Sequence, residues 1–220
     1  MSSQSVSTLH PSGLSPDSAN AADLDLLAAV LGRSLSLAAR RIAAAGLIEA
    51  FGGLAEVAAA DETTLRRHGL AAAAVADLGN ARSLALAMAR AEACRRPVLS
   101  SWTALTSYLR ASLAHAPREQ FRVLYLDRRN ILMRDEWRAD GTTSHAPVYP
   151  REVVRRALEL SASALILVHN HPSGDPGPSH SDIDMTCRVL EAARVFDIQV
   201  HDHVIVGREG TASFKSLGLM

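Results

Sequence analysis

Apolar positions recur at helical spacing through the first half of the chain. Between residues 21 and 96 the composition is dominated by Ala and Leu, with glycines interrupting the pattern. This spacing predicts several short helices that pack as a small all-α domain. The predicted helices cover residues 24–31, 35–45, 54–59, 62–68 and 81–93, with Ser34 and Asp61 as the expected N-caps of the second and fourth.

The second half alternates between strand and helix patterns. Pro97 marks its start, because the residue before a proline is pushed away from helical geometry. Strands are predicted over residues 120–126, 130–138, 164–168 and 199–206, the first two as a hairpin-like pair, and helices over 101–114, 150–160 and 179–195. Residues 97–220 are therefore expected to form an α/β domain with helices around a mixed sheet.

Composition adds limits on the class of protein. The 220 residues are 48% hydrophobic and 21% charged, an ordinary globular balance. Residues 1–20 are rich in Ser and contain Pro11, Gly13 and Pro16, so a disordered tail is predicted. No run approaches the roughly 20 apolar residues that cross a bilayer, and no signal-peptide pattern opens the chain. We therefore expect a cytoplasmic protein without a membrane partner.

Charge and cysteine content point the same way. Lys plus Arg equals Asp plus Glu at 23 each, so the net charge does not predict wholesale neutralisation of a nucleic-acid backbone. Cys94 and Cys187 lie far apart without a partner spacing, which suits a reducing compartment. Both are expected to be buried as small apolar residues.

Candidate chemistry is concentrated where the strand at 164–168 gives way to the next helix. His169 and His171 are two residues apart, so a strand turns both side chains to one side. A loop rich in Pro and Gly then leads to Asp182, in the first turn of the helix. Two imidazoles and one carboxylate suit a catalytic zinc site with an open fourth position. Zinc lowers the pKa of a bound water from about 15.7 to about 7.

Ser179 lies three residues before Asp182, and two roles remain open for it. On a helix its hydroxyl would share the face of the metal ligand and could donate a hydrogen bond to a developing oxyanion. Ser is also a favoured N-cap residue, which would make its role structural.

These residues resemble a known signature. His-x-His, ten residues and Asp, with Pro172 after the second His and Ser179 before the Asp, is similar to the JAMM motif of JAB/MPN-type zinc hydrolases. The segment HNHPSGDPGPSHSD, with VYPREVVRRALEL before it and HDHVIVG after it, resembles the bacterial RadC family more narrowly. The resemblance is close from Glu119 to Gly207, looser from about residue 21, and fails over the first twenty residues.

The resemblance implies a cytidine-deaminase-like, MPN-type fold, one Zn2+ per chain and amide hydrolysis of a protein or peptide substrate. It also implies that Glu119, at the start of the first long strand, is the general base. Taken alone, a Glu beside Arg118 is more often a solvated charge. Glu136 and Glu152 are weaker candidates for the same role.

Two other functions stay open. In RadC-like proteins the helical region resembles a helix-hairpin-helix module, which suggests a DNA-associated repair or recombination factor. Here the expected Gly-x-Gly turn reads HGLAA over residues 68–72, so the second glycine is missing and DNA binding is weakly supported. The third reading is a non-catalytic MPN-like interaction scaffold.

Several other residues invite comparison with the proposed ligands. His201-Asp202-His203 is a second His-x-His, but no Ser-x-x-Asp helix turn follows it, so His201 is not expected to bind metal. Asp202 and His203 match a pair found in the resembled family and could orient a ligand. The remaining candidates are expected to be turn or surface residues (Asp175, His180 and Asp184) or packing residues (Trp102, Trp137 and Tyr149).

Overall fold

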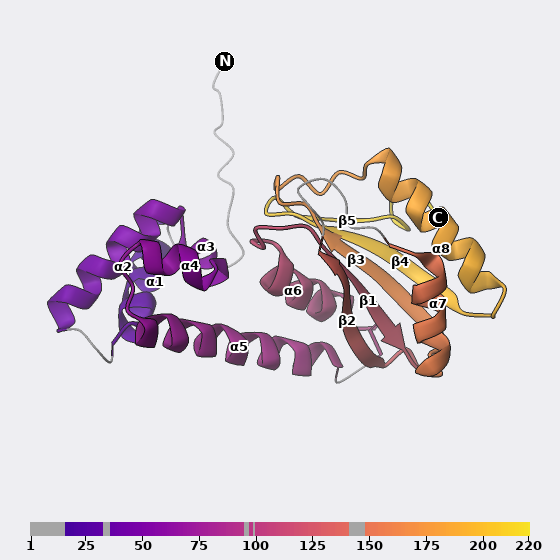
Figure 1. Cartoon of the computed structure of the whole chain (residues 1–220), viewed down its shortest axis with the longest axis horizontal. Helices are drawn as coiled ribbons and strands as arrows, with labels where there is room; N and C mark the ends of the chain where they lie inside the picture. Colours follow the sequence, from indigo (N-terminus) through magenta and orange to yellow (C-terminus); the bar gives the residue numbers. More distant parts are fainter. Residues whose placement is uncertain (1–15, 33–35, 95–96, 99, 141–147) are drawn as a thin grey trace, which may run out of the picture. The chain divides into compact units, whose positions relative to one another are not determined.

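The computed structural model describes residues 16–32, 36–94, 97–98, 100–140 and 148–220. Its contacts divide the chain into two compact units, residues 1–81 and 82–220. Helix α5 (Ala72–Cys94) crosses this division (Figure 1). The boundary predicted at residues 96–97 lies just beyond the end of that helix and stays a prediction.

The first unit is helical, as the apolar spacing predicted. It contains α1 (Pro16–Val30), α2 (Leu37–Phe51), α3 (Leu54–Ala59), α4 (Glu62–Arg67) and the beginning of α5. The buried side chains that hold these helices together are mainly aliphatic: Leu27, Leu31, Ala44, Leu47, Val57, Leu65, Ala74 and Leu78.

The starts of three helices, α1, α2 and α5, differ from the predicted ones. Helix α1 begins at Pro16, so the last residues of the predicted tail are helical, while residues 1–15 lie outside the described part. Helix α5 begins at Ala72 rather than at residue 81. Ser34 also lies outside the described residues, and the N-cap of α2 is Ser36, whose Oγ accepts a hydrogen bond from the Ala39 N–H.

The turn after α4 is closed by its own backbone. Asp61 caps α4 as predicted, accepting a hydrogen bond from the Thr64 N–H at 2.9 Å. Gly69 has a φ of +87°, a conformation that glycine adopts without steric cost. The N–H groups of Gly69 and Leu70 donate to the carbonyls of Arg66 and Leu65. Both groups are thus engaged within the turn, so a phosphate contact here would need other donors.

The second unit is built on a five-stranded mixed sheet with the order β2-β1-β3-β4-β5. β1 is antiparallel to β2 and β3, β3 is parallel to β4, and β4 is antiparallel to β5. The strands are β1 (Gln120–Leu126), β2 (Leu132–Asp140), β3 (Ala164–Asn170), β4 (Gln199–Val206) and β5 (Thr211–Ser213). This confirms the mixed α/β class, with the predicted bounds of β1 and β4, and adds β5, which was not predicted.

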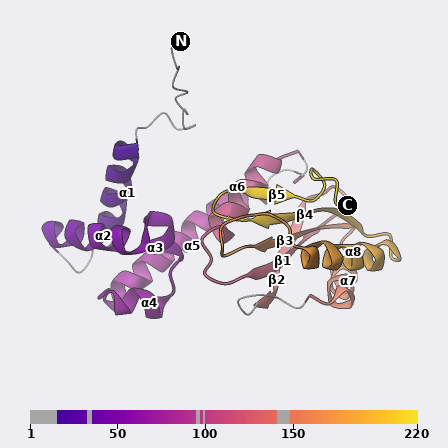
Figure 2. The ribbon, with the colours of Figure 1, turned by 90° about the horizontal axis from the view of Figure 1, so that it is seen from above.

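Helices cover both faces of this sheet (Figures 1 and 2). Helix α6 (Trp102–Leu113) packs on one face, and α7 (Pro150–Glu159) and α8 (His180–Arg194) pack on the other. Successive residues of a strand point to opposite faces, so Ile166 and Val168 belong to the core under α6. Leu165 and Leu167 belong to the core under α7 and α8.

Helix α8 buries a face that does not include Cys187. Its buried residues are Thr186, Val189 and Ala193, whereas Cys187 is exposed. The prediction that Cys187 is buried was therefore wrong, because the buried face includes a polar Thr. Cys94 is half-buried beside the core under α6, and both thiols are free.

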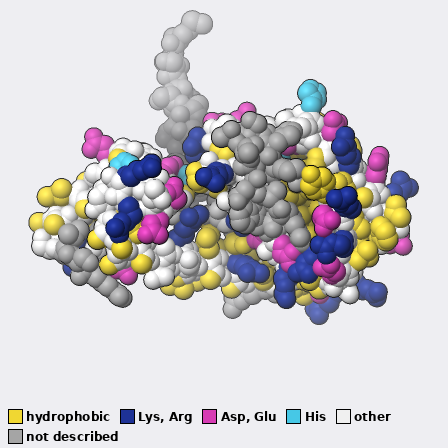
Figure 3. Space-filling model, in the orientation of Figure 1, with side chains coloured by type: hydrophobic (Ala, Val, Ile, Leu, Met, Phe, Trp, Pro, Cys, Tyr) yellow, Lys and Arg dark blue, Asp and Glu magenta, His cyan; other side chains and the backbone are white. Residues whose placement is uncertain are grey.

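The surface carries Lys or Arg and Asp or Glu side chains interspersed on the face shown in Figure 3, in agreement with the zero net charge. No helix in the described ranges is long and apolar enough to span a membrane. Trp102 is partly buried against the core under α6, and Tyr149 is 57% exposed. The side chain of Trp137 lies outside the described part.

Asp202 ties the end of the chain to β4. This buried carboxylate accepts hydrogen bonds from the N–H groups of His203 and Lys215 and from the Ser213 hydroxyl. We expect Asp202→Ala to lower the free energy of unfolding by about 1–3 kcal/mol, because it leaves these donors without an acceptor. Denaturant unfolding measures the effect, with the exposed Glu191→Ala of α8 as the control. Equal stability of the two variants would contradict this account.

Candidate metal centre

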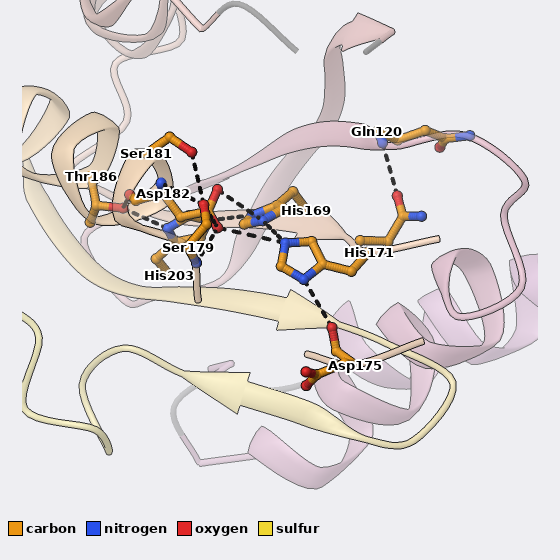
Figure 4. Close-up of polar contacts among 10 residues, drawn as sticks. Gln120, His169, His171, Asp175, Ser179, Ser181, Asp182, Thr186 and His203 are labelled. Atoms are coloured by element: carbon orange, nitrogen blue, oxygen red, sulfur yellow. Dashed lines mark hydrogen bonds and ion pairs between the residues drawn. The ribbon is translucent and has the colours of Figure 1, made fainter. Parts of the chain in front are cut away.

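The end of β3 and the first turn of α8 bring three metal-capable side chains together. His169 lies in β3 on the face that α8 covers, and His171 follows the strand by one residue. Their Nε2 atoms are 3.0 Å apart. The Asp182 carboxylate approaches both, with Oδ1 3.3 Å from His169 Nε2 and Oδ2 3.6 Å from His171 Nε2 (Figure 4). The structure thus brings together all three predicted ligands.

The donor set fits a small divalent cation. Ligand atoms of the three residues all lie within 4.8 Å of one another. Tetrahedral zinc with ligand distances of about 2.0–2.1 Å separates its ligand atoms by roughly 3.3 Å. The two imidazole nitrogens, 3.0 Å apart, and Asp182 Oδ1, 3.3 Å from His169 Nε2, lie close to that separation. His169 is 1% exposed, while His171 and Asp182 are 19% and 14% exposed at the side chain, so the site opens toward solvent on one side.

Asp182 is held in place by the start of its own helix. Ser179 is the N-cap of α8, and its Oγ accepts a hydrogen bond from the Asp182 N–H. In return, Asp182 Oδ2 accepts hydrogen bonds from the Ser179 N–H at 2.8 Å and the Ser179 hydroxyl at 2.6 Å. This reciprocal capping engages Oδ2 and leaves Oδ1 facing His169. The capping role foreseen for Ser179 is present, and its hydroxyl lies beside the candidate ligands.

The loop between the ligands is fixed by backbone contacts. His171 Nδ1 lies 2.9 Å from the Asp175 carbonyl oxygen, while the Asp175 side chain accepts from the Gly177 N–H and closes a turn, as predicted. The His171 N–H donates to the Val206 carbonyl, and the Glu209 N–H donates to the Gly174 carbonyl. The loop is therefore anchored to the segment that follows β4.

Sheet register explains how Glu119 reaches this site. In the antiparallel pair of β1 and β3, Phe121 lies opposite His169. Glu119 precedes Phe121 by two residues and so lies just beyond the paired part of the two strands. Glu119 is half-buried and lines a cavity of about 370 Å³ together with Phe121, Tyr149, His169, Asp182 and Met185. Its carboxylate therefore faces the same space as the candidate ligands.

The weaker candidates for the base are engaged elsewhere. Glu136 pairs with Arg156, linking β2 to α7. Glu152 pairs with Arg155 on the exposed side of α7. His180 and Asp184 are exposed, as expected, although Asp184 contributes to the rim of the cavity.

The two histidines of the second His-x-His, His201 and His203, make different contacts because β4 is irregular at this point. Leu165 pairs with Val200 but Ile166 pairs with Asp202, so the register shifts at this point and the strand alternation is interrupted. His201 Nε2 contacts Asn130, whereas His203 Nε2 lies 2.8 Å from His169 Nδ1. His203 therefore contacts a candidate ligand directly. Asp202, in contrast, accepts hydrogen bonds from Ser213 at the end of β5 and from Lys215 after it.

A further residue at the site was not foreseen. Thr186 is buried on α8, one turn after Asp182, and its Oγ1 lies 2.6 Å from His203 Nδ1. The only signal in the sequence is its spacing of four from Asp182, which places both residues on one helix face.

Charge is distributed unevenly over these groups. Burial opposes ionisation of Asp182, but hydrogen bonds from His169 and His171 outweigh it and hold the pKa of this carboxyl well below its usual range. The hydrogen bond to Asp182 raises the pKa of His171. Burial lowers the pKa of His203 well below its usual value, so His203 is neutral at neutral pH.

Comparisons with known proteins show which family this chain resembles. A family model described as a RadC-like JAB domain matches residues 99–219, which contain every candidate site residue. A UPF0758 protein of Rhodobacter capsulatus is 48% identical over 199 residues, covering 90% of this chain and 93% of the relative. A UPF0758 protein of Ruegeria pomeroyi is also 48% identical over 199 residues, covering 90% and 89% of the two chains.

Gly207 permits the close approach that anchors the ligand loop. A Cβ at this position would lie 2.0 Å from the Gly174 carbonyl oxygen, whereas a Cβ at Gly210 meets nothing within 4 Å. We expect Gly207→Ala to displace the loop, to lower the free energy of unfolding by about 1–3 kcal/mol and to weaken metal uptake. Thermal unfolding and metal analysis test this, with Gly210→Ala as the matched control. Wild-type behaviour of both variants would show that the contact is dispensable.

Proposed function

This chain belongs to the RadC family, and from that premise we propose that it is a zinc-dependent hydrolase that cleaves an amide bond, in a peptide or isopeptide. One observation carries the proposal: two imidazole nitrogens and a carboxylate converge beside a cavity that Glu119 also lines. Three protein ligands with one open position are typical of catalytic rather than structural zinc.

The proposed ligands are His169, His171 and Asp182, holding one zinc ion per chain. Zinc at this position supplies Lewis acidity, which activates water for attack on a carbonyl carbon. Other residues of the chain hold these ligands in position. His169 is buried and oriented by His203, while Ser179 holds one oxygen of Asp182, so the ligands are organised before the ion arrives.

Glu119 is the proposed general base. It lies two residues before Phe121, which pairs with His169, and it lines the same cavity as His169 and Asp182. It takes a proton from the attacking water and returns that proton to the leaving nitrogen, so the carboxylate ends the cycle in its starting form. The Ser179 hydroxyl, which donates to Asp182 Oδ2 in the free site, is proposed to turn its hydrogen bond to the developing oxyanion during the reaction.

The metal assignment predicts a clear difference between variants. We expect the wild-type protein to bind one zinc ion per chain, and His171→Ala and Asp182→Ala to retain it only substoichiometrically, because each removes one of three ligands. Metal analysis after dialysis measures the content, with His201→Ala of the second His-x-His as the control. Full zinc content in both ligand variants would refute the assignment.

If Glu119 is the general base, replacing it should lower hydrolysis without lowering the zinc content. We expect Glu119→Gln to keep its zinc and to lower turnover about 100- to 10,000-fold, the usual contribution of a positioned acid or base. Amine release from a panel of peptides and isopeptides by the zinc-loaded protein measures it. Glu152→Gln is the matched control. A zinc-loaded wild type that is inert toward the whole panel would instead favour the interaction scaffold.

A further inference from the structure

A buried series of hydrogen bonds connects two of the proposed ligands, His169 and Asp182 (Figure 4). His169 Nδ1 lies 2.8 Å from His203 Nε2, and His203 Nδ1 lies 2.6 Å from Thr186 Oγ1. The Thr186 hydroxyl in turn donates to the Asp182 carbonyl oxygen at 2.6 Å. His169, His203 and Thr186 are each no more than 1% exposed. Solvent therefore does not compete for these bonds.

Which group donates in each of these hydrogen bonds follows from the last one, between Thr186 and the Asp182 carbonyl oxygen. A carbonyl oxygen only accepts hydrogen bonds, and the Thr186 hydroxyl has a single proton, which it donates there. Toward His203 the same oxygen is then an acceptor, so His203 Nδ1 carries a proton. A neutral His203 accepts at Nε2 and receives the Nδ1 proton of His169. This arrangement leaves the Nε2 lone pair of His169 for a bound zinc ion.

His171 reaches the same state by a shorter route. Its Nδ1 faces the Asp175 carbonyl oxygen at 2.9 Å, so this nitrogen donates and Nε2 is the atom left for a bound zinc ion. For each histidine, the hydrogen bonds that start at Nδ1 end on a backbone carbonyl. For His171 the contact is direct, and for His169 it passes through two side chains.

We propose that Thr186 and His203 are positioning residues that hold His169 in the tautomer with an unprotonated Nε2, and so set the affinity of the site for zinc. The inference rests on the proposed metal site and adds to it a residue from the middle of α8. Because Thr186 bonds to the Asp182 backbone, the same hydroxyl couples the orientation of one ligand to the position of another.

The test compares zinc affinities of Thr186 variants by competition with a chromophoric chelator. Thr186→Val has nearly the same shape but no hydroxyl, and we expect it to bind zinc about 10- to 100-fold more weakly, as is usual when a group orienting a ligand is lost. Thr186→Ser restores the hydroxyl and should recover most of the affinity. Thr106→Val is the matched control, since Thr106 makes the same kind of bond to a helix carbonyl, that of Trp102 in α6, away from the site.

A spectroscopic readout on the zinc-loaded wild type does not depend on the folding of any variant. Imidazole 15N shifts at mildly alkaline pH should show a proton on Nδ1 of His203 and none on its Nε2, which accepts from His169. The buried His203 proton should exchange slowly and be absent from the Thr186→Val spectrum. A proton on His203 Nε2 would overturn the inference.

The remaining outcomes are equally decisive. Unchanged zinc affinity in folded Thr186→Val would leave Thr186 a structural role only and reject the inference, even if the variant were less stable. Loss of affinity in Thr106→Val as well would reject it too, since a general weakening of helices would then explain the effect. A wild-type protein that binds no zinc would reject the proposed function itself, a result distinct from both.

Discussion

The placement of β3 inside the sheet is the constraint on which the site depends. Paired with β1 on one side and β4 on the other, β3 has its register fixed twice. The first pairing sets Phe121, two residues after Glu119, opposite His169, and the second brings His203 beside His169. A slip of one residue would turn His169 toward α6 and remove both neighbours. The apolar residues of β3, buried on both faces, make such a slip costly.

The ligand carboxylate has two tasks that support each other. Asp182 closes the capping box at the start of α8 and faces the two histidines. The negative charge is also favoured by the positive end of the helix dipole. The fold therefore compensates for part of the cost of placing an anion in a half-buried site. The same carboxylate stabilises the helix that carries Thr186, so helix geometry and site geometry are linked.

Much of this arrangement was predictable because it is local. The His-x-His spacing on a strand and the Asp in the first turn of a helix follow from the geometry of single elements, and the bounds of β1 and β4 follow from their apolar runs. The face of α8 was not predictable in the same way, since Thr186 is buried for its bond to His203, which lies on another element. The continuation of α5 through Gly79 and the three residues of β5 likewise depend on surroundings that no local pattern encodes. Glu119 was identified through a family resemblance, because strand register is absent from a single sequence.

The two edges of the sheet differ in a way that bears on aggregation. One edge is the short strand β5, which offers little backbone for pairing with another chain. The other is β2, whose pairing with β1 is interrupted by two register shifts and which carries Arg134, Asp135 and Glu136 in succession. Charged and irregular edges are poor templates for strand addition. A chain with a central strand as apolar as β3 is thereby protected from polymerising through its own sheet once folded.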